Sequence, residues 1–190
     1  MSSGHGGTDQ TQYLTFLLAD EVYAVSILRV KEIIEYGTVT RVPNMPPSIR
    51  GVINLRGAVV PVVDLVVRFR LGESKVTNRT CVIIAEFQAK GEPVVMGLIA
   101  DSVSQVIDLA PGEIEPPPSF GTSVRVDFLK GLGKTAKKFV LILDLDRVLS
   151  AEELLTASDS PAATSDAGKR NGALPAPAAS EAAAGSEVHA

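Results

Sequence analysis

The chain has 190 residues, of which 45% are hydrophobic and 21% charged, and its formal net charge is −4. This composition supplies a core and excludes a disordered or collagen-like protein, and the acidic balance argues against a nucleic-acid partner. One cysteine excludes a disulfide scaffold, and with the two histidines, His5 and His189, near the chain ends we expect no catalytic residues and no metal site.

The first half of the chain predicts short strands joined by turns. Alternating apolar residues predict a hairpin from Tyr13–Leu18 and Val22–Ser26. In the next segment, Ile27–Ile34, the apolar residues have helical spacing, which predicts a turn or two of helix. Val39–Val42 is expected to be a strand, whereas the three prolines of the segment Pro43–Pro47 exclude a regular ladder there.

The second half continues this pattern. The segments Gly51–Leu55 and Ala58–Leu65 predict two strands joined by a tight turn, in which Gly57 can adopt a positive φ. Further predicted elements are a hairpin of Arg79–Phe87 with Pro93–Ile99, a strand at Lys138–Leu143 and helical spacing from Asp144 to Leu155. Many short strands with Gly and Pro turns are typical of small β-barrels or a sandwich.

The chain also repeats itself. Four short matches occur in the same order in its two halves, which predicts two related units, each a small barrel. The matched pairs are Val30–Ile34 with Val103–Ile107, Pro46–Ser48 with Pro117–Ser119, Leu55–Gly57 with Leu129–Gly131, and Val59–Leu65 with Phe139–Leu145. The wider spacing of the last pair predicts a longer hairpin loop at 132–137 in the second unit.

Several motifs that suggest chemistry have simpler interpretations. Gly131–Thr135 resembles the end of a P-loop, but the required first glycine is replaced by Phe128, so we expect no nucleotide site. Asp64 and Asp144 occupy equivalent places in the two repeats, which favours turn or helix-capping roles. Cys81 has no histidine nearby and is expected to be a buried, inert thiol.

Two stretches, Ile27–Ile34 and Ile53–Leu65, closely resemble the CheW family of bacterial chemotaxis coupling proteins. The later stretches Gly97–Val103 and Phe128–Gly133 are also similar to that family. The resemblance runs in order from about Gln12 to Leu155. It implies a mainly β fold of two pseudo-symmetric, five-stranded SH3-like barrels packed together with short helices, which agrees with the internal repeat.

The resemblance further implies an adaptor without catalytic activity or a cofactor. Such proteins couple transmembrane chemoreceptors (methyl-accepting chemotaxis proteins) to a chemotaxis histidine kinase, whose regulatory domain has the same fold. The family's receptor-binding segments match this chain at Val30, Glu32, Asn54 and Arg56, whereas its kinase contacts cannot be transferred to particular residues. We expect the protein in the cytoplasm, at receptor arrays near the inner membrane.

Each of these four residues also has a structural interpretation. Val30 could be core packing, Glu32 and Arg56 could be solvated charges, and Asn54 could hold its turn by bonding its own backbone. An alternative class for the whole chain is an enzyme or a small-ligand barrel that uses Asp64 or Asp101, which predicts a concave polar pocket with perturbed carboxylates. A kinase-regulatory domain has the same fold, but the chain has no ATP-binding or phosphorylation domain beside it.

Both ends of the chain lie outside the predicted core. Residues 1–10 are expected to be a flexible N-terminus, since they lack the features of a secretory signal, and no apolar run is long enough to span a membrane. After the folded domain, residues 11–156, the chain becomes rich in Ala, Ser, Pro and Gly, so residues 157–190 are expected to be a disordered tail.

The tail's composition leads to a first testable prediction. Because residues 157–190 have almost no aliphatic side chains to bury, ending the chain at Thr156 should change the free energy of unfolding by less than about 1 kcal/mol. Urea denaturation of the full and shortened chains measures this difference. A clearly lower midpoint for the shortened chain would show that the tail packs against the folded domain.

Overall fold

The structure is a computed structural model that describes residues 10–117, 122, 124–135 and 138–150. In this part of the chain, strands predominate and the helices are short. The strands are β1 (Thr11–Leu18), β2 (Glu21–Ser26), β3 (Val30–Glu35), β4 (Ile49–Leu55), β5 (Ala58–Asp64), β6 (Cys81–Ala89), β7 (Glu92–Ala100), β8 (Ser102–Leu109), β9 (Ile114–Glu115), β10 (Leu129–Lys134) and β11 (Phe139–Leu143). The helices are α1 (Leu65–Arg68) and α2 (Leu145–Val148), and the 3-10 turns are η1 (Ile27–Arg29), η2 (Pro111–Glu113) and η3 (Val126–Phe128).

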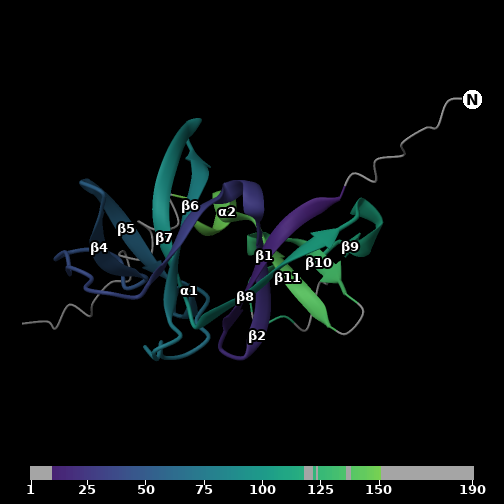
Figure 1. The fold of residues 1–190 in the computed structure, drawn as a ribbon, viewed down its shortest axis with the longest axis horizontal. Coiled ribbons are helices and arrows are strands. Elements are labelled where there is room, and N and C mark those ends of the chain that lie inside the picture. The colour runs from purple at the N-terminus through teal and green to yellow at the C-terminus, as the bar shows by residue number, and fades with distance from the viewer. Residues whose placement is uncertain (1–9, 118–121, 123, 136–137, 151–190) are drawn as a thin grey trace, which may run out of the picture. The chain divides into compact units, whose positions relative to one another are not determined.

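The strands form two curled sheets, seen side by side in Figure 1. Barrel A has the strand order β8-β1-β2-β11-β10-β9, and barrel B has the order β3-β6-β7-β5-β4. The predicted architecture of two pseudo-symmetric barrels is confirmed, although the two-residue strand β9 gives barrel A a sixth member. The predicted hairpins β1–β2, β4–β5 and β6–β7 are all present.

The two sequence repeats do not each form a barrel, so that prediction is wrong. The hairpin β1–β2 of the first repeat pairs with β8 and β11 of the second, and the hairpin β6–β7 of the second pairs with β3 and β5 of the first. The repeats have therefore exchanged their hairpins. Because each barrel needs strands from both halves of the chain, neither half can close a barrel alone.

Strand register fixes which positions of the two barrels correspond. In β4–β5 the bulge lies before Gly51, which pairs with Val62, and in β10–β11 it lies before Gly131, which pairs with Ile142. Gly51 therefore corresponds to Gly131, and the predicted match of Leu55–Gly57 with Leu129–Gly131 is wrong. The extra residues of the second repeat precede β10, in the segment that carries η2, β9 and η3, rather than in the hairpin loop.

Three local predictions also need correction. In Ile27–Ile34 only η1 is helical, and the rest is strand β3, because its backbone pairs with β6 along the edge of barrel B. In the segment 39–42 only Thr40 pairs, through an isolated bridge to Val52. Asp64 and Asp144 each cap a short helix, which was one of the roles expected of them, and the strand predicted to reach Leu65 ends at Asp64. Of the helix predicted from Asp144 to Leu155, the described part, up to Ser150, contains only the four-residue α2.

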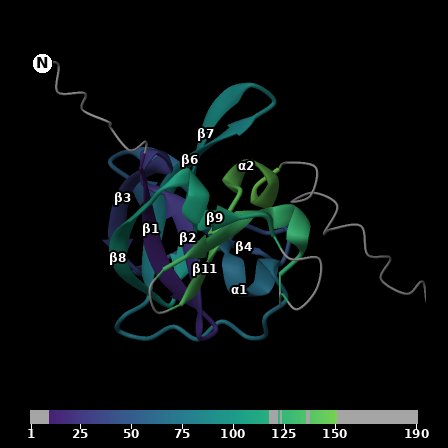
Figure 2. The ribbon, with the colours of Figure 1, turned by 90° about the vertical axis from the view of Figure 1, so that its right-hand side faces the viewer.

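The largest core lies between the two barrels. It takes buried side chains from β1, β2, β5, β6, β7 and both helices. The helices α1 and α2 lie on the same side of the strands in Figure 2. Within it the rings of Phe16, Tyr23, Phe69 and Phe128 form a continuous row, with successive centroids 5.7–6.2 Å apart. Each barrel has a smaller core of its own, around Ile142 in barrel A and around Ile84 in barrel B.

Several expectations fall partly or wholly on residues that the structure does not describe. They include the flexible segment 1–10, of which only Gln10 is described, the match at Pro118 and Ser119, the hairpin loop at 132–137, the last residues of the helix predicted to Leu155 and of the domain predicted to 156, and the tail at 157–190. Within the described residues, no helix is long and apolar enough to cross a membrane.

Candidate partner-binding site

The tight turn between β4 and β5 is held by its own residues. The backbone N–H of Gly57 donates to Asn54 Oδ1 at 2.8 Å, and Arg56 and Gly57 both have left-handed backbone angles, with φ of 53° and 90°. Two consecutive positive φ angles are typical of a two-residue hairpin turn whose twist matches the strands. Asn54 thus has the structural role that was its alternative interpretation, and it also fixes how Arg56 projects.

Arg56 and Glu32 form an ion pair at the surface of barrel B. The Arg56 Nη2 atom lies 3.0 Å from Glu32 Oε2, and the two side chains are 80% and 27% exposed. The pair connects the β4–β5 turn to β3, so it links the two edge strands of the barrel B sheet. From the sequence, Glu32 was expected on a helix, and nothing predicted its contact with Arg56. In the structure, Glu32 lies on a strand and Arg56 reaches it across the barrel.

Val30 is separated from the other three predicted site residues by a β-bulge. Val30 pairs with Ala85 and Glu32 pairs with Ile84, so two positions along β3 oppose two adjacent positions on β6. Adjacent strand residues point to opposite faces, so Val30 and Glu32 do too. Val30 is half-buried against the core between the barrels. The structure therefore brings together Glu32, Asn54 and Arg56, and places Val30 on the other face of β3.

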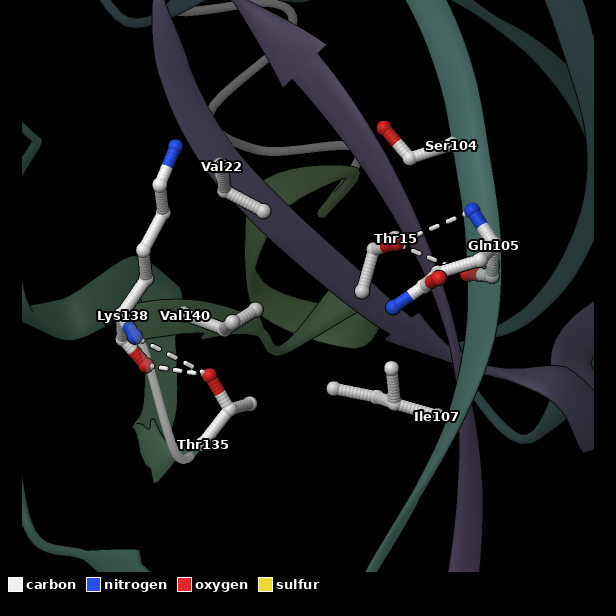
Figure 3. A pocket seen from close by; sticks show the side chains of 8 residues that line it. All are labelled: Thr15, Val22, Ser104, Gln105, Ile107, Thr135, Lys138 and Val140. Carbon is white, nitrogen blue, oxygen red and sulfur yellow. Dashed lines mark hydrogen bonds between the residues drawn. The ribbon is translucent and has the colours of Figure 1, made fainter.

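Barrel A has a cavity beside Gln105, the residue that corresponds to Glu32. A cavity of about 460 Å³ lies between β1, β2, β8 and the β10–β11 turn, as Figure 3 shows. Its lining residues are Thr15, Val22, Ser104, Gln105, Ile107, Thr135, Lys138 and Val140. Gln105 lies in the bulge that corresponds to the one at Glu32, and the Thr15 hydroxyl bonds its backbone at 2.7 and 3.2 Å. The position that corresponds to Arg56 is Ala136, which lies outside the described residues.

The carboxylates of the enzyme alternative serve structural roles. Asp64 is 1% exposed, lies 3.2 Å from Arg50 Nη2 and accepts the Val67 N–H at 3.2 Å. Asp101 accepts the backbone N–H of Ala19 at 2.8 Å and so ties β7 and β8 to the β1–β2 turn. Neither residue lines the cavity of barrel A, whose lining has no carboxylate. The geometry therefore does not favour an enzyme that uses these two groups.

Two further motifs lie on strands β10 and β6, and Cys81 is only half-buried, whereas a buried thiol was expected. Gly131–Lys134 belongs to strand β10 rather than to a phosphate-binding loop. The Cys81 thiol is half-buried, and burial raises its pKa, which reduces its thiolate fraction and hence its reactivity. In the described part of the chain, no group of three or more His, Cys, Asp or Glu residues could hold a metal ion.

The structure exposes apolar residues that sequence reasoning missed. Ile33 on β3 and Val106 on β8 occupy corresponding positions on the edge strands, and they are 44% and 46% exposed. Val59 at the start of β5 and Phe139 at the start of β11 also correspond, and they are 72% and 58% exposed. Apolar exposure that recurs at corresponding places of two barrels is a signal for binding rather than for folding.

The fold and these surfaces define a two-barrel protein whose candidate site is a partner-binding surface. The CheW-like domain model matches residues 12–153, and the chain belongs to the CheW-like family. It is 37% identical over 149 residues to the chemotaxis protein CheW of Klebsiella aerogenes, covering 78% of this chain and 87% of that protein. It is 34% identical over 145 residues to CheW of Bacillus subtilis, covering 76% and 90%.

A solved structure agrees with this assignment. The crystal structure of the scaffolding protein TtCheW from Thermoanaerobacter tengcongensis matches with a TM-score of 0.69 and 33% sequence identity, and the match covers 80% of this chain and 96% of that one. The chain is therefore a member of a family of chemotaxis scaffolding proteins.

Proposed function

We propose that this protein is a chemotaxis adaptor that couples transmembrane chemoreceptors to a chemotaxis histidine kinase and has no catalytic activity of its own. Its support is family membership along residues 12–153 and the similarity to proteins named as chemotaxis and scaffolding proteins. Its place in the cell would be the cytoplasm, at receptor arrays near the inner membrane.

Of the four residues predicted to bind the receptor, Glu32, Asn54 and Arg56 form the proposed site, and Val30, on the other face of β3, packs against the core and supports it. Arg56 supports this proposal best, because it is 80% exposed and its backbone is fixed by a hydrogen-bonded turn. The cytoplasmic tips of receptors are helical, and a helix is received by apolar contact area flanked by a few charges. In this arrangement Arg56 and Glu32 would set register and partner choice more than affinity.

The proposed kinase sites are the exposed apolar pairs, Ile33 with Val59 on barrel B and Val106 with Phe139 on barrel A. Their recurrence at corresponding positions is the observation that carries the proposal. A partner with the same two-barrel fold, such as the regulatory domain of the kinase, could pair with either barrel through similar contacts. If barrel A of one molecule contacts barrel B of the next, the contact is head-to-tail and uses a different surface on each partner. One molecule can then bind two neighbours, one through each barrel.

These surfaces lead to a prediction for kinase binding. Replacing both Val59 and Phe139 with Asp should weaken binding to the purified kinase regulatory domain at least ~10-fold, because charges replace exposed apolar contacts. The Tm should change little, since both side chains are exposed. Isothermal calorimetry measures the affinity, and Val76→Asp is the matched control, because Val76 is 51% exposed and belongs to neither pair.

The same experiment separates the two interfaces. Receptor binding by the single variant Phe139→Asp should persist, because Phe139 lies on barrel A, whereas Val59 pairs across β4–β5 with Asn54 of the receptor site. If the double variant binds the kinase domain as tightly as the Val76→Asp control does, these apolar pairs are not the kinase sites. If the unmodified protein binds neither a receptor tip nor a kinase domain, the proposed adaptor function is wrong.

A further inference from the structure

The cavity of barrel A has an apolar floor that is continuous with the core of that barrel. Of its lining residues, Val140 belongs to this core, and Val22 and Ile107 pack against it. All eight lining residues lie in the described part of the chain, and the volume of about 460 Å³ falls within the range of roughly 300–1,000 Å³ that is usual for small-molecule sites. A compact apolar group bound here would therefore extend the core of barrel A.

The polar residues of the lining fall into two groups. The Thr15 hydroxyl bonds the backbone of Gln105 at 2.7 and 3.2 Å. The Thr135 hydroxyl bonds the backbone of Lys138 at the same two distances, so both threonines hold the walls of the cavity in place. By contrast, the side chains of Ser104, Gln105 and Lys138 make no hydrogen bond or ion pair in the part of the chain that the structure describes.

Two of these unpartnered side chains face each other across the apolar floor. In Figure 3 the amide group of Gln105 points into the cavity beside Ile107, and Lys138 lies on the opposite side beside Val22. An amide group and an ammonium group both donate hydrogen bonds. Lys138 is the one charged residue among those that line the cavity, so the lining favours a ligand with a negatively charged acceptor.

The surroundings leave the charge of Lys138 available to a ligand. Asp20 and Glu21 line a second hollow that Lys138 also borders, but Lys138 forms no ion pair with either carboxylate. Barrel B differs at the corresponding place, because Glu32 occupies the position of Gln105. A ligand carboxylate would be repelled by Glu32, whereas it can accept a hydrogen bond from Gln105. The two barrels therefore differ in the ligand that they can take.

We propose that the cavity of barrel A binds a small monocarboxylate with a compact apolar body. The apolar body would contact Val22, Ile107 and Val140. The carboxylate would accept hydrogen bonds from Gln105 and Lys138, and a bond from an ammonium group to a carboxylate is stronger than one between neutral groups. This inference does not depend on the adaptor function.

Phenylacetate is the probe, because it has one aromatic ring and one carboxylate. In amide NMR spectra of the full chain, it should shift the signals of Gln105 and Ile107 until they saturate and leave that of Glu32 unchanged. Phenethylamine has the same ring and a positive charge, so it should bind at least ~10-fold more weakly. Equal affinities for the two compounds, or equal shifts in both barrels, would overturn the proposal.

A matched pair of lysine variants tests the contact with the carboxylate. Lys138→Gln should weaken phenylacetate binding about 5- to 10-fold and leave the affinity for the neutral analogue phenethyl alcohol unchanged. The control is Lys134→Gln, because Lys134 is also exposed, lies on the same β10–β11 hairpin and does not line the cavity. If the two variants bind phenylacetate equally, Lys138 does not hold the carboxylate and the proposal is wrong.

A third variant tests the place of the apolar body. Val22→Phe should fill the cavity and abolish binding of both phenylacetate and phenethyl alcohol, with the Tm as the check that the variant is folded. Unchanged binding by the folded variant would overturn the proposal. If the signals of the lining residues instead shift with protein concentration in the absence of ligand, a second copy of the chain occupies the cavity and the proposed occupant is wrong.

Discussion

Arg56→Asp is expected to abolish receptor binding while leaving the fold intact. On the proposed function, this substitution reverses the charge that projects furthest from the turn, and a like charge facing the partner costs several kcal/mol, or at least ~100-fold in affinity. The cost to folding is small, because an exposed ion pair contributes about 0–1 kcal/mol and aspartate tolerates a left-handed φ such as the 53° found here.

Three measurements check this expectation. Binding to a receptor tip and receptor-dependent kinase activation should be lost, whereas the Tm and kinase binding without receptor should be retained. The control is Lys90→Asp, because Lys90 has the same φ of 53° and precedes Gly91 in the β6–β7 turn. If the Arg56→Asp variant binds the receptor normally, the β4–β5 turn is not part of the receptor site. If the variant is unfolded, Arg56 has a structural role.

The hairpins could be predicted from the sequence because their information is local. Alternating apolar residues and a turn residue lie within about twenty positions of each other in β1–β2, β4–β5 and β6–β7. The exchange of hairpins could not be predicted in this way, because it depends on which distant edge each hairpin joins. The sequences of β3 and β8 do not assign either strand to one barrel, and only the three-dimensional pairing distinguishes the two choices.

The misinterpretation of Ile27–Ile34 has a specific cause. A bulge between Val30 and Glu32 adds one residue to β3, which shifts the alternation by one position. The apolar residues then fall at 27, 30, 33 and 34, a spacing that an amphipathic helix also produces. A bulge therefore gives a strand the spacing of apolar residues that is typical of a helix. The strand register is needed to tell the two structures apart.

The candidate site was predicted only in part, because some of its contacts depend on how distant strands pair. Asn54 and Arg56 share one turn, so their spacing in sequence shows that they are neighbours. The contact of Arg56 with Glu32 joins residues 24 positions apart and exists only because the barrel closes. Exposed apolar residues such as Val59 and Phe139 were missed because the sequence does not show which way an apolar strand residue faces until the register is known.

Asp64→Ala should be among the most destabilising single substitutions in the chain. Asp64 is 1% exposed, and its carboxylate both accepts the Val67 N–H at 3.2 Å and lies 3.2 Å from Arg50 Nη2. Removing it leaves a partly buried guanidinium without that carboxylate and α1 without its cap, at a cost of about 3–4 kcal/mol.

The internal symmetry supplies the control, Asp144→Ala. Asp144 caps α2 through the Arg147 N–H at 3.4 Å and pairs with Arg147 Nε at 3.4 Å, but its side chain is 29% exposed. Water can replace these contacts, so we expect a loss of about 1 kcal/mol. Urea denaturation of both variants measures the difference. Similar losses would mean that the caps carry the whole effect and that burying the Asp64–Arg50 pair adds nothing, whereas a three- to fourfold ratio would show that the buried pair adds to the cap.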